Sequence, residues 1–352
     1  MNNFVKKSSR GEARVGERTT KMGWALLLSC LVASCAAQDV SQNEFGCHCM
    51  GYWTCITRGG TINSYCGLSE SSVCCFVPYN AKPVGLLPKV QKVKSCGRKG
   101  SSGHKEGQAE MFEWPWHAAV LESRQDLYVC GASLVHETWL LTAAHCVDDY
   151  VPYVAEGEPL LKVRLGEYDV STTAEPLRHE EHFVRKLVLH PEFDNATLVN
   201  DIALLKLATS VRRRPNVDSV CTPSKNDFKE GSKAKCYVTG WGRKDEASSH
   251  SVVLKEISVP LWNNDHCQTA LRQQFGPAYV LPPTAICAGA EGRDACDGDG
   301  GGPLVCEKAG QWYQVGVVSF GIGCGERSVP GVYTRVEAYE QWIRDTIGFT
   351  NE

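Results

Sequence analysis

Eighteen cysteines in a chain of 352 residues are the strongest constraint on how this protein folds. Two of them, Cys30 and Cys35, lie in the apolar run GWALLLSCLVASCAA (residues 23–37), which follows a basic stretch and ends in small residues. Such a run is typical of a cleaved secretory signal; a membrane anchor or a short buried helix is the alternative. Removing residues 1–37, with Met22 as a second candidate start, leaves an even number of cysteines for disulfide bonding. We expect an N-terminal extension and signal peptide on an extracellular protein.

The charge balance gives no indication of nucleic-acid binding. The chain has 37 Lys and Arg against 40 Asp and Glu, and residues 1–37 carry more bases than acids. The mature chain is therefore acidic, whereas a nucleic-acid-binding domain needs a basic surface. Asn195 begins an Asn-Ala-Thr sequon, which fits secretion and marks a candidate N-glycosylation site.

Six cysteines crowd into residues 47–75 with the spacing C-x-C-x5-C-x10-C-x7-C-C. So short a segment buries too little apolar surface to fold without covalent staples, each worth about 2–4 kcal/mol. Cys47, His48 and Cys49 allow zinc as the competing interpretation, but the adjacent cysteine pair at the end of the segment suits one tetrahedral site poorly. We expect a small disulfide-knotted domain over residues 46–76.

The rest of the chain divides into a linker and one large domain. Residues 77–95 contain three prolines and several lysines, which predicts an extended, exposed linker. After it, β-branched and aromatic runs such as CYVTGWG and QWYQVGVVSFG alternate with Gly, Pro and Asp. This rhythm predicts an all-β barrel or sandwich over residues 96–352, and the spacing in VEAYEQWIRDTIG predicts a C-terminal helix.

Three separated segments carry the residue types of nucleophilic catalysis. They are LTAAHC with His145, NDIALLKL with Asp201, and DACDGDGGGPLVC at residues 294–306. Together with VTGWG, SFGIGCG and PGVYTRV, these segments resemble the chymotrypsin-like serine proteases, in that family's order of His, Asp and nucleophile loop. The resemblance covers roughly residues 96–348 and implies a double six-stranded β-barrel with a C-terminal helix.

The resemblance also assigns a role to each position of the site. His145 matches the general base, Asp201 matches the carboxylate that orients it, and Gly298 matches one backbone donor of the oxyanion hole. Gly300 stands where the family has its serine, and loss of this nucleophile typically costs about a million-fold in turnover. Asp297, where the family commonly has glutamine, places a negative charge beside the oxyanion hole and so opposes hydrolysis. The resemblance therefore implies an inactive homologue.

The start of the large domain departs from the family pattern. Active members begin at an Ile-Val terminus that inserts and pairs with the aspartate matching Asp299. Here the corresponding stretch is CGRKGSSGHKEGQAEMF, and cleavage after Arg98, Lys99 or Lys105 exposes Lys, Gly or Glu, all unsuited to burial. We expect the domain to stay zymogen-like or to hold Asp299 with another partner.

A specificity pocket is implied in the same way. Asp294 matches the position that makes a trypsin-like pocket accept Arg or Lys, and Gly321 and Gly331 match positions that leave the pocket open. One interpretation is a pocket that binds a basic side chain of a partner. The other, which we favour, is an inherited pocket without a function, because a charge contact needs a formed, desolvated site.

A calcium site is a further hypothesis. A loop beginning LGE binds calcium in related proteases, and here Glu167, Asp169 and Glu181, with Glu180 beside the last, offer the oxygen ligands that calcium prefers. Solvated acids are the alternative interpretation. We expect that no cofactor is required.

The cysteine-rich segment resembles the clip domain of arthropod extracellular proteases. Six cysteines allow fifteen connectivities, so the pairing follows from resemblance alone. The resemblances to clip domains and to the protease family together imply eight disulfides: Cys47–Cys74, Cys49–Cys66, Cys55–Cys75, Cys96–Cys221, Cys130–Cys146, Cys236–Cys306, Cys267–Cys287 and Cys296–Cys324.

The whole mature chain thus resembles the clip-domain serine protease homologues, akin to masquerade-like proteins and prophenoloxidase-activating cofactors. This resemblance implies a haemolymph protein that acts as a binding cofactor in prophenoloxidase activation and melanisation. Its expected partners are prophenoloxidase or an activating clip-domain protease, and an upstream protease whose cleavage in the linker or near Lys105 permits oligomerisation. We expect neither nucleic-acid nor membrane partners. A trypsin-like endopeptidase with residual activity and a decoy or adhesion protein are the alternatives.

Overall fold

The computed structural model describes residues 47–66, 72–78, 81, 96–100, 107–243 and 247–348. The expected signal peptide, nearly all of the expected linker, and Lys105 lie outside these residues. The described residues after Cys47 belong to one compact unit, His48–Glu352. The domain boundaries given above stay a prediction.

The first described segment is a small three-stranded antiparallel sheet with one short helix. The strand order is β1-β3-β2, and Cys55, Val73 and Cys75 are its buried centre. Because Cys47 and the other five cysteines of this segment are disulfide-bonded, they offer no thiolates, and the zinc interpretation is wrong. The elements are β1 (His48–Gly51), α1 (Tyr52–Thr57), β2 (Thr61–Tyr65) and β3 (Ser72–Phe76).

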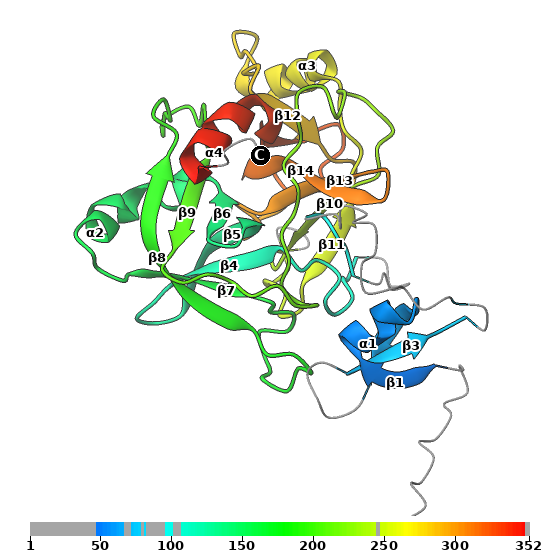
Figure 1. Cartoon of the computed structure of the whole chain (residues 1–352). Helices are drawn as coiled ribbons and strands as arrows, with labels where there is room; N and C mark the ends of the chain where they lie inside the picture. The colour runs from blue at the N-terminus through cyan, green and yellow to red at the C-terminus, as the bar shows by residue number, and fades with distance from the viewer. Residues whose placement is uncertain are drawn as a thin grey trace, which may run out of the picture. The chain divides into compact units, whose positions relative to one another are not determined.

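The next six strands close into an antiparallel barrel in the order β4-β5-β6-β9-β8-β7 (Figure 1). In β7, Leu161, Val163 and Leu165 are buried and alternate with the partly exposed Lys162 and Arg164, as a strand with one face on a core requires. The elements are β4 (His117–Glu122), β5 (Leu127–His136), β6 (Trp139–Thr142), α2 (Val151–Ala155), β7 (Leu161–Leu165), β8 (Glu180–Leu189) and β9 (Ala203–Leu207).

Six further strands form the second sheet, in the order β11-β10-β13-β14-β15-β12. A bridge between Leu261 and Ala288 joins the chain after β11 to β12, so the two ends of this sheet meet as well. The predicted double six-stranded barrel is thereby confirmed. The elements are β10 (Cys236–Gly240), β11 (Lys255–Ser258), α3 (Asn264–Phe275), β12 (Ala285–Ala288), β13 (Pro303–Lys308), β14 (Gln311–Phe320) and β15 (Gly331–Arg335).

A C-terminal helix follows the second barrel, as the sequence predicts. The helical turn Val336–Tyr339 leads into α4 (Glu340–Ile347), which ends at Gly348 in the left-handed conformation (φ 80°). Val336, Tyr339 and Ile343 are buried in the same core cluster as residues of the first barrel. The helix therefore packs against the core that the two barrels share (Figure 1).

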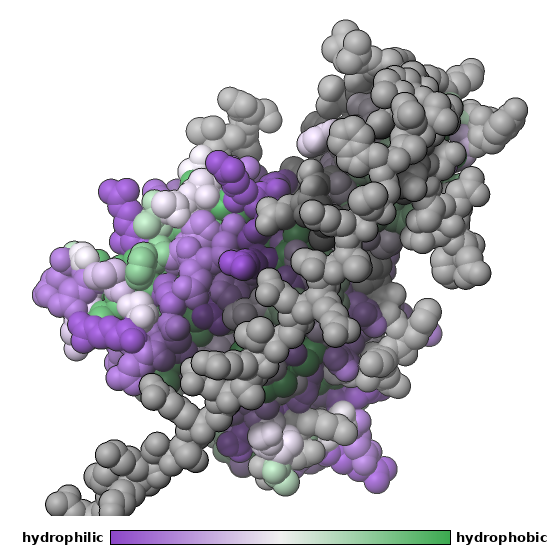
Figure 2. All heavy atoms as spheres, turned by 90° about the horizontal axis from the view of Figure 1, so that it is seen from below, coloured by the Kyte–Doolittle hydropathy of each residue, from purple (hydrophilic) through white to green (hydrophobic). Residues whose placement is uncertain are grey.

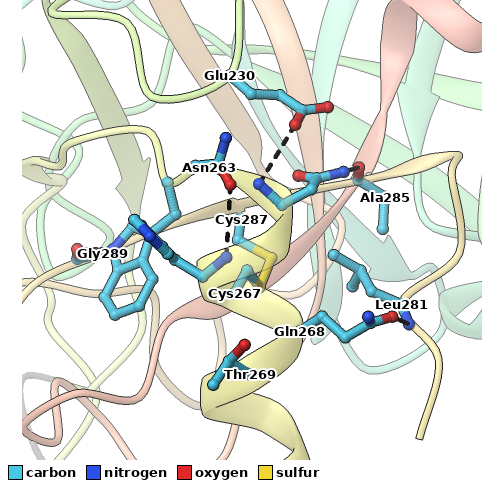
Figure 3. Close-up of a disulfide and its surroundings, with 12 residues drawn as sticks. Glu230, Asn263, Cys267, Gln268, Thr269, Leu281, Ala285, Cys287 and Gly289 are labelled. Carbon is cyan, nitrogen blue, oxygen red and sulfur yellow. Dashed lines mark hydrogen bonds between the residues drawn. A yellow bond between two sulfur atoms is a disulfide. The ribbon is translucent and has the colours of Figure 1, made fainter.

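Disulfides fix the loops around this core. The Cys267–Cys287 bond ties α3 to β12 (Figure 3). The Asn263 side chain caps α3 by accepting from the backbone N–H groups of Asp265 (2.9 Å) and His266 (3.4 Å). Figure 3 also shows the Gln268 side chain turned toward the backbone N–H of Leu281 (3.0 Å). The structure contains the expected pairs Cys49–Cys66, Cys55–Cys75, Cys96–Cys221, Cys130–Cys146, Cys236–Cys306, Cys267–Cys287 and Cys296–Cys324, and Cys47 and Cys74 are disulfide-bonded too.

The described surface is mixed in character. On the face shown in Figure 2, hydrophilic side chains cover most of the coloured surface and hydrophobic ones are interspersed among them. Among the described residues, every helix is too short or too polar to cross a bilayer. The disulfides fit an oxidising, extracellular compartment.

Candidate functional site

His145 and Asp201 meet where the two barrels join. His145 lies in the short helical turn after β6, and Asp201 lies two residues before β9. His145 Nδ1 is 2.7 Å from Asp201 Oδ2, and the backbone N–H of His145 donates to Oδ1 (2.9 Å). Asp201 is fully buried, and the hydroxyls of Ser319 and Thr334 from the second barrel donate to its carboxylate and carbonyl oxygens. The pair is thus fixed by four hydrogen bonds.

This arrangement sets the basicity of the imidazole. Burial alone would lower the pKa of His145, but the hydrogen bond and the negative charge of Asp201, with a contribution from Asp148, raise it above its ordinary value. Nε2 of the same ring lies 3.6 Å from Cys146 Sγ. The structure therefore retains an oriented base in the position that the sequence predicts.

Gly300 lies opposite this base. A Cβ added at Gly300 would lie 3.6 Å from His145 Nε2 and 3.6 Å from Cys130 Sγ, which is ordinary van der Waals contact. The backbone at Gly300 is outside the left-handed region, and its carbonyl accepts from the N–H of Gly131 (2.8 Å). The position could hold a side chain without strain, but it carries only a hydrogen.

The expected oxyanion position is closely packed. Gly298 has φ 94°, and a Cβ there would lie 2.6 Å from Cδ2 of His250, so a side chain does not fit. The Tyr128 hydroxyl donates to the Gly298 carbonyl (2.8 Å). Asp297, next along the loop, is exposed and lies 3.9 Å from the Arg243 guanidinium. The contacts from Tyr128 and His250 were not predictable from the sequence, because both residues come from distant segments.

Asp299 points into the second barrel and has partners there. Its carboxylate accepts from the backbone N–H groups of Gly242 (2.9 Å) and Cys296 (3.0 Å). Burial raises its pKa to about 6, against the effect of these hydrogen bonds and of the positive charge of Lys255. Two backbone N–H groups thus hold the Asp299 carboxylate in the uncleaved chain, and whether the domain stays zymogen-like after cleavage remains a prediction.

A cavity of about 180 Å³ adjoins Gly300, and Gly321 and Gly331 are among its lining residues. Asp294 is buried behind Gly331, where its Oδ1 accepts from the N–H of Ala295 (2.8 Å) and the hydroxyl of Tyr333 (3.3 Å). Burial raises the pKa of Asp294 to about 7 despite these bonds. The expected pocket residues are thus brought together, with the carboxylate beneath the wall of the cavity.

A second, larger hollow of about 350 Å³ lies on the other side of Phe320. Leu198 and Val199 line one side of it, and Tyr279 and Val280, from the segment that follows α3, line the other. Sequence reasoning missed this hollow, since its walls are more than 70 residues apart along the chain. The exposed, apolar Val280 is the signal that could have indicated it.

The three candidate calcium ligands do not converge. Glu167 is buried and bound by His179 (2.8 Å) and Arg164 (3.4 Å). Asp169 is partly exposed and accepts from Ser171, and Glu181 is paired with Lys162 and Arg164. Glu175, which the sequence analysis did not single out, accepts from the backbone N–H of Asp169 (2.7 Å) and lies beside Glu167.

The glycosylation sequon and a group of metal-ligand residue types both lie near His145. Asn195 is exposed, and its side-chain amide donates to the Asp148 carboxylate, close to His145 in the fold. In the described part of the chain, Cys130, His145 and Cys146 form the one compact group of three metal-ligand residue types. Because the two cysteines are joined in a disulfide, this group is not a metal site.

Two antiparallel barrels with a histidine–aspartate pair and a glycine-rich loop at their junction define a trypsin-type fold and site. The family model for trypsin matches residues 103–343 of the chain, so the protein belongs to the trypsin family. Its relatives place it, within that family, among the clip-domain serine protease homologues.

Three relatives support this placement. "Inactive CLIP domain-containing serine protease A3" of Aedes aegypti is 40% identical over 247 residues, which cover 68% of this chain and 50% of that protein. "Phenoloxidase-activating factor 2" of Galleria mellonella is 38% identical over 70% of this chain and 84% of its own length. "Protein masquerade" of Drosophila melanogaster is 38% identical over 69% of this chain and 23% of its own length. The match thus spans half or less of two of these three relatives.

Proposed function

We propose that this protein is a secreted, non-catalytic cofactor or regulator of an extracellular protease cascade. The single observation that carries the proposal is the hydrogen of Gly300 opposite His145 Nε2, where a trypsin-type enzyme needs a hydroxyl. Loss of the nucleophile in this enzyme class lowers turnover by about a million-fold. A chain that keeps the fold and the oriented base but lacks the attacking atom acts by binding.

The names of the relatives indicate the cascade. One relative is called a phenoloxidase-activating factor and another is called inactive. We infer a role in prophenoloxidase activation and melanisation in haemolymph, with prophenoloxidase or its activating clip-domain protease as the bound partner. An upstream protease would process the chain, and processing would permit oligomerisation. We expect this role to need no cofactor, because Glu167 is already bound by Arg164 and His179, and Glu181 by Lys162 and Arg164.

The test is a reconstituted reaction that contains an activating protease and prophenoloxidase. We expect the processed protein to increase the phenoloxidase activity that appears, and the His145→Gln variant to increase it equally. Because His145 would be essential to any hydrolysis, equal enhancement by this variant separates a binding role from residual catalysis. Inhibition or no effect would contradict the proposal and favour a decoy or adhesion protein.

Residual trypsin-like activity is the second candidate, and two observations favour it. The His145–Asp201 pair is intact, and a cavity adjoins Gly300. This candidate requires that the cleaved protein hydrolyse Arg or Lys peptide esters or react with a serine-directed phosphonate. We expect neither reaction.

A further inference from the structure

The main chain at Gly97 is bound both to the segment that joins the two barrels and to β14 of the second barrel. The Cys96–Cys221 disulfide fastens the preceding residue. The N–H of Gly97 donates to Ser219 (2.7 Å), and the carbonyl of Gly97 accepts from the N–H of Trp312 (3.0 Å). Gly97 has φ 70°, and a Cβ there would lie 2.4 Å from the Trp312 carbonyl, so the chain can approach this closely only at a glycine.

The Lys99 side chain is buried in a cage of three aromatic rings. Only 9% of the side chain is exposed, and its ammonium lies 4.3 Å from the ring centre of Trp114, 5.6 Å from that of Trp312 and 5.7 Å from that of Tyr237. The ammonium is also paired with the carboxylate of Glu113, which is 1% exposed. Cation–π attraction and a buried counterion together hold a charge that would otherwise be costly to bury.

Each wall of this cage is itself fixed. The second carboxylate oxygen of Glu113 accepts from the backbone N–H of Glu110 (2.7 Å), and its carbonyl accepts from the N–H of Gly100 (2.9 Å). The indole N–H of Trp114 donates to Glu256 (2.8 Å). Lys99 and the peptide bond that follows it are therefore held at both the side chain and the main chain.

Arg98 is held on the other side of the segment. Its Nε and Nη2 both donate to one carboxylate oxygen of Asp218, at 3.1 and 2.9 Å, and Asp218 is buried. Arg213 lies 3.6 Å from the other carboxylate oxygen. Two donors from one guanidinium to a carboxylate make a strong, directional contact.

A protease that cleaves after Arg or Lys must take that side chain into its own pocket and the flanking main chain into its cleft. We propose that residues 96–100 form a clasp that shields the Arg98–Lys99 and Lys99–Gly100 bonds from such a protease, so that processing falls at other basic residues. This inference rests on the proposed function only in taking the protein to be the target of an upstream protease. It agrees with the expectation from the sequence that cleavage falls in the linker or near Lys105, and it adds a physical reason why Arg98 and Lys99 are spared.

Limited digestion with trypsin tests the clasp, with new amino termini read by mass spectrometry. In the native full-length chain we expect cleavage after Arg98 or Lys99 to be at least about 100-fold slower than in the reduced, denatured chain, because it must await local opening. The Glu113→Gln variant removes the counterion of Lys99 and should speed cleavage after Lys99 by about tenfold or more. Glu156→Gln, at an exposed position after α2, is the matched control and should change neither rate.

Hydrogen exchange on the unaltered protein keeps the test independent of how the variant folds. We expect the amide hydrogens of Gly97 and Gly100, which donate to the buried carbonyl groups of Ser219 and Glu113, to exchange as slowly as those of the barrel strands. Cleavage after Lys99 in the native chain at the rate of the denatured chain, or rapid exchange of these amides, would overturn the clasp. Neither result bears on phenoloxidase enhancement, so failure of the clasp and failure of the proposed function are told apart.

Discussion

The Ser319 hydroxyl lies 2.6 Å from Asp201 Oδ2, the same oxygen that His145 Nδ1 meets at 2.7 Å. Ser319 belongs to β14 of the second barrel, whereas Asp201 precedes β9 of the first. A buried carboxylate needs such partners whether or not it takes part in a reaction. The packing of the two barrels thus gives a physical reason for the His145–Asp201 pair to persist in a chain that has glycine at position 300.

The Gly300→Ser variant tests how much of an active site remains. The added side chain fits, with its Cβ 3.6 Å from His145 Nε2, so we expect normal folding. We expect hydrolysis of Arg peptide esters to stay about 10²–10³-fold below that of an active trypsin-type protease, because Asp299 lacks the terminal amine that organises the oxyanion donors. Gly300→Ala is the control without a hydroxyl. Robust hydrolysis by the serine variant would show that the domain does not stay in a zymogen-like conformation.

The stability of the protein should fall as pH rises through the titration of Asp294. Burial raises the pKa of this carboxyl to about 7, above its unfolded value of 3.8. The folded state therefore binds the proton more tightly, and this contribution to stability is complete below about pH 4 and lost as pH rises through about 7.

Asp294→Asn removes this titration and keeps the shape. We expect the variant to gain on the order of 2 kcal/mol of unfolding free energy relative to the unaltered chain between pH 4 and pH 8, measured by urea unfolding at each pH. The control is Asp297→Asn, whose carboxyl is largely exposed. If the difference in unfolding free energy between Asp294→Asn and the unaltered chain stays the same from pH 4 to pH 8, the pKa of Asp294 is not raised by burial.

Calcium should not stabilise the protein. A cation bound at 100 times its dissociation constant would add about 2.7 kcal/mol, which a thermal melt detects readily. Because the Glu167 carboxylate is already bound by the Arg164 guanidinium and the His179 imidazole, we expect the same unfolding midpoint with calcium or with a chelator. A calcium-dependent rise that Glu167→Gln abolishes would restore the calcium hypothesis.

The cap of α3 should support one wall of the larger hollow. Asn263→Ala removes the acceptor for the N–H groups of Asp265 and His266 and should cost about 1 kcal/mol in urea unfolding. Gln273→Ala, at an exposed position on the same helix, is the control and should change stability by less than about 0.5 kcal/mol. Equal effects of the two variants would show that the cap is not stabilising.

The features that could be predicted from the sequence are those carried by short motifs. The double barrel, the C-terminal helix and the family follow from motifs around His145 and Asp201, since each motif keeps a fixed place on this fold. The contacts of Ser319, Tyr128 and Lys99 were not predictable, because their partners lie far along the chain and become neighbours only when the barrels pack.

The calcium loop shows the same limit at short range. Glu167 and Glu181 were named for their residue type and spacing, but a carboxylate pairs with whichever cation lies nearest in the fold. Here those cations are Arg164 and Lys162, and the imidazole of His179 contacts Glu167 as well. The spacing of the acids alone does not show which positively charged side chain will contact the carboxylate oxygens of Glu167 and Glu181 in the fold.

Because of the Cys96–Cys221 bond, the position of a proteolytic cut decides whether the two fragments stay covalently linked. A cut on the carboxyl side of Cys96 leaves the small cysteine-rich sheet and the barrels on one molecule, where each holds the other at a high effective concentration near a shared target. A cut on the amino side, given that the expected disulfides of the small sheet are all internal, yields two independent ligands. Whether the cut falls before or after Cys96 would thus decide between bivalent binding by one linked molecule and weaker, monovalent binding by two separate fragments.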